Sequence, residues 1–174
     1  ILRKALTDSG FPIPREKKLN TILEQMLGAR RDANPVIKLG GHQLRRYDDH
    51  IYMIRFPLGN PTIEKSFFWD GIKDMTFPWG TLRAEETDGV GLNEKLLTEG
   101  TLSIAFRRGG ERFCPHDRNR ATKLKKLFQE WRVPPWERSL IPLIYVDDRL
   151  AAVGSLAIAK EFGISENLSS NKRF

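Results

Sequence analysis

The segment Phe56-Pro-Leu-Gly-Asn-Pro divides the chain into two parts with different residue patterns, and this constrains the fold more than any other feature. Before it, apolar residues recur with the period of an amphipathic helix and are followed by short strand-like runs. After it, most apolar runs are short and are separated by glycine and proline, which is typical of strands and turns. We therefore predict an α+β protein with two domains, residues 1–58 and 59–174.

The first domain is predicted to hold two helices followed by a three-stranded meander. The second helix places five apolar residues on one buried face: Leu19, Ile22, Leu23, Met26 and Leu27. A shorter helix precedes it and turns three residues inward: Leu2, Ala5 and Leu6. The run VIKLGGHQLRRYDDHIYMIRF then predicts three short strands, with turns at Gly40-Gly41 and Asp48-Asp49.

The second domain is predicted to be β-rich, like a sandwich or barrel, with one prominent amphipathic helix. TFPWGTL and GTLSIAFR resemble strands, and LIPLIYVDDRLAAVGSLAI predicts a hairpin around Asp147-Asp148. The helix is expected from about Arg120 to Arg132, with Asn119 or Asp117 as its cap. Its apolar arc comprises Ala121, Leu124, Leu127, Phe128 and Trp131. Pro134-Pro135 stops it, because proline lacks the backbone donor.

Basic residues are concentrated in two regions that an acidic region separates. Lys and Arg outnumber Asp and Glu by 11 to 6 in residues 1–58 and by 10 to 4 in residues 105–138. In residues 59–104 the order reverses, 4 to 8, and residues 139–174 are balanced, 4 to 4. Clustering of this kind favours a polyanionic partner such as nucleic acid, although many domains have a basic face that binds nothing.

Composition excludes several other classes of protein. The 174 residues include a single cysteine, Cys114, so no disulfide can form within the chain. No apolar run approaches the 18 or more residues of a membrane span, and the first residues do not resemble a signal peptide. We therefore expect a cytoplasmic protein with no membrane partner. Because the chain begins at Ile1 without methionine, we also expect it to be part of a longer protein.

The cysteine and histidines do not form a convincing reactive site. A structural zinc site needs about four ligands, whereas Cys114 and His116 lie far along the chain from His42 and His50. A cysteine–histidine nucleophilic pair would also need a third residue that orients the histidine, and none is evident. We predict no catalytic and no metal-binding residue in this chain.

The stretch RRGGERFCPHDRNRATKLKKLFQEWRVPPWER contains the densest basic cluster. It lacks the Gly-Lys-Ser/Thr ending of a nucleotide-binding P-loop. Gly109-Gly110 forms either a plain hairpin turn or a turn that lets the backbone approach phosphate groups. The lysines of the helix have only Glu130 to balance them, which favours a binding face over a merely solvated one. Trp131 is predicted to be in the core, whereas Trp136 either stacks on a base or covers the helix end.

This stretch and the one after it resemble the C-terminal domain of bacterial tRNA(Ile)-lysidine synthetases. The ordered pattern is Arg-x-Gly-Gly-Glu, Pro, Arg, Leu-Lys-Lys-Leu-Phe-Gln-Glu, Val-Pro-Pro-Trp-x-Arg and Ile-Pro-Leu. The opening residues, from LRKALTDSGF to DDHIYMI, are similar to the family's substrate-binding middle domain. The resemblance is weakest from Asn60 to Thr98 and in the last ten residues. Asp117 departs from the pattern, which has glycine there.

The resemblance implies that this chain is the tRNA-binding part of an ATP-dependent ligase. In the family, ATP activates carbon 2 of the wobble cytidine in the CAU anticodon of an isoleucine tRNA, and lysine then attacks. That chemistry belongs to an N-terminal domain with a Ser-Gly-Gly-x-Asp-Ser loop, which binds ATP, lysine and Mg²⁺. This sequence has no such loop, since Phe11 follows Ser9-Gly10. A homodimer of the full-length enzyme is also compatible with the resemblance.

The residue pattern and the resemblance together select the candidate tRNA contacts. In the second domain they are Arg107, Arg108, Gly109, Gly110, Arg112, Arg118, Lys123, Lys126, Arg132, Trp136 and Arg138. In the first domain they are Arg30, Arg31 and one of the pair Arg45 and Arg46, because neighbouring strand residues point to opposite faces. The alternatives are a stand-alone RNA- or protein-binding module and a self-sufficient hydrolase, for which no nucleophile or base is apparent.

Overall fold

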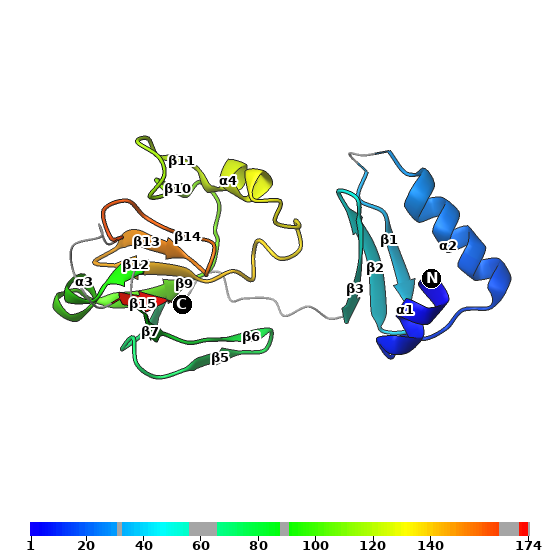
Figure 1. Ribbon diagram of the computed structural model, residues 1–174, viewed down its shortest axis with the longest axis horizontal. Helices are drawn as coiled ribbons and strands as arrows, with labels where there is room; N and C mark the ends of the chain where they lie inside the picture. The colour runs from blue at the N-terminus through cyan, green and yellow to red at the C-terminus, as the bar shows by residue number, and fades with distance from the viewer. Residues whose placement is uncertain (31–32, 56–65, 88–90, 164–170, 174) are drawn as a thin grey trace. The chain divides into compact units, whose positions relative to one another are not determined.

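The computed structural model describes residues 1–30, 33–55, 66–87, 91–163 and 171–173. The chain forms two compact units, Ile1–Leu58 and Gly59–Phe174, and each is described by itself (Figure 1). The Phe56–Pro61 segment that separates the two sequence patterns lies outside the described residues.

Unit 1 packs two helices against one face of an antiparallel sheet (Figure 1). Its elements are α1 (Leu2–Asp8), α2 (Glu16–Gly28), β1 (Val36–Leu39), β2 (His42–Tyr47) and β3 (His50–Arg55). The strand order β1-β2-β3 is that of the predicted meander. Asp48 has a φ of +53° in the turn between β2 and β3, a conformation that aspartate tolerates better than most residues.

The core of unit 1 lies between these helices and the sheet. Leu6, Ile22, Met26, Leu39 and Leu44 are buried there. The predicted helix face is confirmed for Leu19, Ile22 and Met26, but Leu27 is 68% exposed. An arc of five residues was too wide, because the sheet covers only one side of α2.

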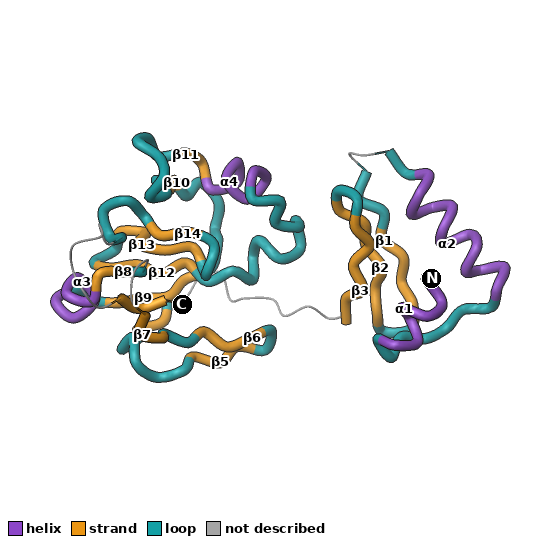
Figure 2. The backbone as a smooth tube through the Cα atoms, in the orientation of Figure 1, coloured by secondary structure: helices purple, strands orange, loops and turns teal. Residues whose placement is uncertain are grey.

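Unit 2 consists mostly of short strands and loops, as Figure 2 shows. Its elements are β4 (Phe67–Phe68), β5 (Met75–Phe77), β6 (Gly80–Leu82), β7 (Glu85–Thr87), β8 (Leu92–Asn93), α3 (Glu94–Glu99), β9 (Leu102–Ala105), β10 (Arg112–Phe113), β11 (Thr122–Lys123), α4 (Leu124–Glu130), β12 (Leu143–Val146), β13 (Arg149–Val153), β14 (Ala157–Ile158) and β15 (Asn171–Arg173).

The central sheet has the order β14-β13-β12-β9-β4. Because β14 and β4 are both edges, no barrel closes among the described residues, and the molecule has the predicted α+β class. The hairpin predicted at Asp147-Asp148 is confirmed, with φ of +47° and +63° at its two central residues. Positive φ at both positions gives the turn a twist that matches that of the flanking strands.

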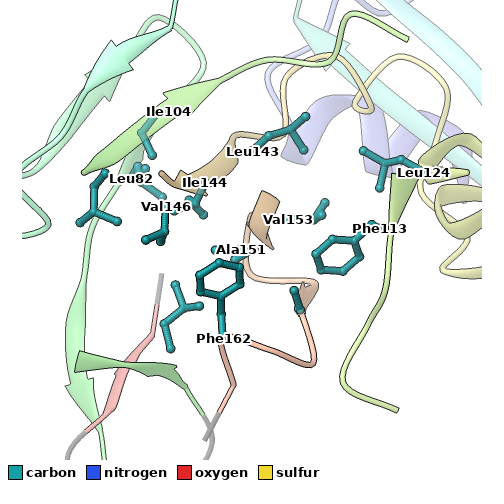
Figure 3. Close-up of a cluster of buried hydrophobic side chains, with 14 of the residues drawn as sticks. Leu82, Ile104, Phe113, Leu124, Leu143, Ile144, Val146, Ala151, Val153 and Phe162 are labelled. Atoms are coloured by element: carbon teal, nitrogen blue, oxygen red, sulfur yellow. The ribbon is translucent and has the colours of Figure 1, made fainter. Parts of the chain in front are cut away.

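One large hydrophobic cluster holds unit 2 together (Figure 3). The sheet contributes Ile104, Leu143, Ile144 and Val153, all fully or nearly fully buried. The β10–β11 hairpin and α4 cover this core from one side in Figure 1, and the β5–β6 hairpin from the other. Burial of apolar area stabilises the unit by about 25 cal/mol per Å², so the surface elements that carry basic residues are anchored by the same core.

Candidate nucleic-acid interface

The β10–β11 hairpin separates charged from apolar side chains by strand alternation. Arg112 pairs directly with Lys123 and Phe113 with Thr122. The Arg112 and Lys123 side chains are exposed, whereas Phe113 is buried and its ring packs edge-on against Trp131 at 6.4 Å. Leu124 N donates a hydrogen bond to Glu111 O at 2.9 Å, so the hairpin leads straight into α4.

Helix α4 rests on the core through one face. Leu124, Leu127 and Phe128 are fully buried, and Lys125 and Lys126 are exposed on the other side. The helix begins at Leu124 rather than near Arg120, and Ala121 is exposed outside it. The predicted caps are also wrong, because Lys123 occupies the N-cap position without a side-chain hydrogen bond. Thr122 and Lys123, which periodicity places in the first turn of the helix, instead form a strand that pairs with β10.

The exposed cations around this helix, together with the half-buried Arg118, form one basic surface, which we call the α4 surface. It comprises Arg112, Arg118, Arg120, Lys123, Lys125 and Lys126. Glu130 is the carboxylate that pairs within it, at 2.6 Å from Arg118 and 3.9 Å from Lys126. Among the described residues, no carboxylate pairs with Arg120, Lys123 or Lys125. The surface therefore keeps most of its positive charge available to an external anion.

The Gly-Gly turn contains a carboxylate of its own. Gly109 and Gly110 have φ of +104° and +91°, which only glycine adopts readily. The backbone N–H groups of Arg108 and Gly109 both donate to Glu111 Oε1, at 2.5 and 2.7 Å. Glu111 Oε2 lies 3.7 Å from Arg107 Nε. The structure favours a plain turn over a phosphate-binding turn, because the N–H groups of Arg108 and Gly109 that a phosphate would need already donate to Glu111.

The end of α4 depends on the backbone of Arg132. Its φ is +55°, its N–H donates to Gln129 O, and Val133 N donates to Phe128 O at 2.9 Å. These two bonds are the Schellman arrangement that satisfies the last helical carbonyls. The Arg132 side chain is exposed beside the α4 surface.

Two predicted contact residues beyond this stop are buried instead. Trp136 is 9% exposed, so its ring faces are not available for stacking on a base. Arg138 is also 9% exposed, and its Nε donates to Val133 O at 2.9 Å. The Arg138 bond ties together the residues on either side of Pro134-Pro135, and burial removes both Trp136 and Arg138 from the candidate contacts.

In unit 1, Arg45 and Arg46 point to opposite faces of β2, as strand alternation predicts. Arg46 Nη1 and Nη2 donate to four carbonyl oxygens at the end of α2: those of Met26, Leu27, Ala29 and Arg30. A cation at this position satisfies carbonyls that have no helical partner. Arg45 lies on the other face and donates twice to Gln43 Oε1, at 2.9 and 2.7 Å. Arg30 is exposed, and Arg31 lies outside the described residues.

Sequence reasoning missed two cations that lie next to Arg112. Arg149 on β13 and Lys160 after β14 line a hollow with Arg112, because Pro115 and Ala159 form a bridge that brings their segments together. The balanced charge of residues 139–174 concealed them. Only the pairing of distant segments could have revealed them.

The described residues offer no group of three or more His, Cys, Asp or Glu side chains that could hold a metal ion. Cys114 Sγ donates to Arg118 O at 3.4 Å. In the part of the chain that the structure describes, no helix has the length and apolarity needed to cross a membrane. Asp117 is exposed and does not cap α4, which starts later in the chain.

Comparison with known proteins places both units. Residues 1–52 match the model of the TilS substrate binding domain, and residues 102–170 match that of the TilS substrate C-terminal domain. A tRNA(Ile)-lysidine synthase of Coxiella burnetii is 35% identical over 164 residues, which are 93% of this chain and 36% of that protein. One from Legionella pneumophila strain Lens is 31% identical over 165 residues, 93% of this chain and 37% of that protein.

A third relative, the tRNA(Ile)-lysidine synthase of Shewanella woodyi, is 29% identical over 179 residues, which cover 96% of this chain and 38% of that protein. The chain thus spans little more than a third of the length of the curated relatives that it matches. The first matched domain lies within unit 1, and the second lies within unit 2. The chain belongs to the tRNA(Ile)-lysidine synthase family and carries its substrate-binding and C-terminal domains.

Proposed function

We propose that this chain is the tRNA-binding part of a tRNA(Ile)-lysidine synthase, an ATP-dependent ligase that attaches lysine to carbon 2 of the wobble cytidine in a CAU anticodon. The observation that carries the proposal is the α4 surface, where Glu130 pairs with two of six cations on and around a helix anchored in the core. The names of the relatives indicate which polyanion it serves.

The α4 surface suits phosphate groups for a physical reason. A protein that neutralises phosphates releases condensed counterions, which supplies much of the binding free energy and makes it depend on salt. Because its buried residues fix the hairpin and helix, the surface is held in one shape before RNA arrives. Contacts with phosphate and 2′-hydroxyl groups recognise the shape of double-stranded RNA rather than its sequence. We propose Arg108, Arg112, Arg118, Lys123, Lys126 and Arg132 as contacts.

The chemistry itself is proposed to occur elsewhere in the full-length enzyme. The residues here do not fit an ATP site: Ser9 ends α1, Gly10 N donates to Thr7 O, and the following Phe11 is buried in the core. These backbone groups cannot cradle phosphates. We propose that ATP, Mg²⁺ and lysine bind outside this chain, and that this chain alone does not modify tRNA. Its cytoplasmic location and the homodimer stay predictions.

Charge reversal on the α4 surface tests the proposal. We expect the triple variant Arg112→Glu, Lys123→Glu and Lys126→Glu to lose most affinity for folded isoleucine tRNA. Each lost phosphate contact lowers the slope of log affinity against log salt by roughly 0.7–0.9. The matched control reverses Lys4, Lys17 and Lys18, which are exposed on α1 and α2 and change the net charge equally. Binding can be measured by fluorescence anisotropy at several salt concentrations.

Two outcomes would reject the assignment. Unchanged affinity of the α4 triple variant at physiological salt would show that RNA binds elsewhere. Equal loss in the control variant would show a nonspecific effect of net charge. Competition between folded isoleucine tRNA and random-sequence RNA separates this proposal from a stand-alone binding module, which would not distinguish the two.

A further inference from the structure

A hollow of about 490 Å³ lies beside the α4 surface and shares Arg112 with it. It opens between the β10–β11 hairpin, β13 and the residues that follow β14. Its lining comprises Arg112, Phe113, Cys114, Ala121, Arg149, Leu150, Ala159, Lys160 and Glu161. Three cations and one carboxylate therefore meet over a floor that is otherwise largely apolar.

Contacts within the protein hold each of these cations in place. Arg112 Nη2 donates to Ala121 O at 2.7 Å, and Lys160 Nζ donates to Asn119 Oδ1 at 2.5 Å. Arg149 Nη2 donates to Glu161 Oε2, and its Cζ lies 5.1 Å from the centroid of the Phe162 ring. An arginine has five N–H donors and a lysine three, so each keeps donors for a ligand. The side chains are oriented without being saturated.

We propose that this hollow binds a phosphate group of RNA, with Arg112, Arg149 and Lys160 as its ligands. Three cations against one carboxylate leave an excess of positive charge, which suits a phosphate carrying roughly one to two negative charges. The apolar residues Phe113, Leu150 and Ala159 line the hollow, so the attached sugar or base can pack against them. The inference rests on the proposed function, because RNA is the partner that brings phosphate to this face.

Cys114 provides a specific probe of the hollow, because it lines the hollow and is the only cysteine in the 174 residues. We expect a 5′-phosphorylated RNA hairpin to slow alkylation of Cys114 by iodoacetamide. The same hairpin with a 5′-hydroxyl separates the two sources of phosphate. Weaker protection by it assigns the hollow to a terminal phosphate, and equal protection assigns it to a phosphate within the backbone.

Three variants test which side chains hold the phosphate. Arg149→Gln and Lys160→Gln should each weaken RNA binding about tenfold, the usual effect of losing a hydrogen bond to a charged group. Glu161→Gln should have the opposite effect and strengthen binding, because it removes the competing carboxylate. Lys95→Gln, an exposed cation on α3 away from the hollow, should change nothing. Thermal unfolding of each variant shows that it is folded.

The inference fails if neither hairpin protects Cys114, or if the Arg149 and Lys160 variants bind RNA as the wild type does. In that case the proposed function still stands as long as the α4 triple variant loses affinity. If the hollow variants and the α4 triple variant all bind RNA as tightly as the wild type does, the proposed function is overturned as well.

Discussion

Glu111 balances part of the basic cluster in which it lies. Its carboxylate accepts the N–H groups of Arg108 and Gly109 and lies near Arg107. Glu111 thus acts as an internal anion that fixes the Gly-Gly turn in the absence of RNA. The turn orients Arg108 and Arg112 toward solvent, and its glycines serve conformation rather than contact.

The carboxyl group of Glu137 makes the stability of the protein depend on pH. Burial raises the pKa of this carboxyl above its usual 4.5, against the opposing effect of a hydrogen bond with Trp136. From pH 4.5 to the raised pKa, the folded state therefore binds more protons than the unfolded chain, and stability falls as pH rises through that window. The loss persists at neutral pH.

We therefore expect Glu137→Gln to be more stable than the wild type at about pH 7 and to show no gain at about pH 4. The gain should stay below about 1 kcal/mol, because the carboxyl remains partly solvated. Urea unfolding at both pH values measures it. Glu86→Gln, which alters an exposed carboxylate, is the control. A variant gain that is equal at both pH values would contradict the explanation.

Sequence reasoning located the charged residues but not their partners. Alternation along β2 correctly predicted that Arg45 and Arg46 face opposite ways, yet nothing local indicated that Arg46 meets the end of α2. For the same reason, Arg138 was expected on the surface and Trp136 was left as either a stacking residue or a cover for the helix end. Both are buried in the structure, and burial depends on packing between distant segments, which local sequence does not show.

At the element scale, α4 ends on a non-glycine residue in the left-handed region. A side chain there costs roughly 1 kcal/mol relative to the right-handed helix, and glycine avoids that cost. We expect Arg132→Gly to raise the stability of unit 2 by up to about 1 kcal/mol and at the same time to weaken RNA binding. Arg132→Asn, which tolerates positive φ, should lose the same affinity. Chemical denaturation and RNA titration test both effects, and a less stable Arg132→Gly variant would contradict the role of the helix stop.

Elements with strong local signals were predicted well. The Asp147-Asp148 hairpin, the meander around Gly40-Gly41 and the core of the buried face of α2 (Leu19, Ile22 and Met26) follow from turn chemistry and periodicity. The start of α4 did not, because a two-residue strand pairing overrides helical periodicity at Thr122. Short strands such as β4 and β8 owe their conformation to partners far along the chain. A local pattern cannot show this.

At the scale of the whole molecule, each unit has its own hydrophobic core and its own basic residues. The cores of Ile1–Leu58 and Gly59–Phe174 share no residue, which predicts that each unit folds by itself. Arg30 is exposed in unit 1, and Arg45 lies on the sheet face opposite the helices. Under the proposed function, one RNA would therefore meet two separate sets of contacts joined by a covalent link.

The link itself should increase affinity. When two modules bind one ligand, the second binds at the effective concentration set by the linker, and the gain over separate modules reaches about 10²–10⁴-fold. We expect the intact chain to bind isoleucine tRNA at least about tenfold more tightly than an equimolar mixture of residues 1–58 and 59–174. It should also have a steeper salt dependence than residues 59–174 alone, because unit 1 adds phosphate contacts.

Circular dichroism of each fragment, compared with the intact chain, controls for folding. Equal affinity and equal salt slope for residues 59–174 and the intact chain would show that unit 1 contacts no RNA and would confine recognition to the α4 surface and the neighbouring hollow.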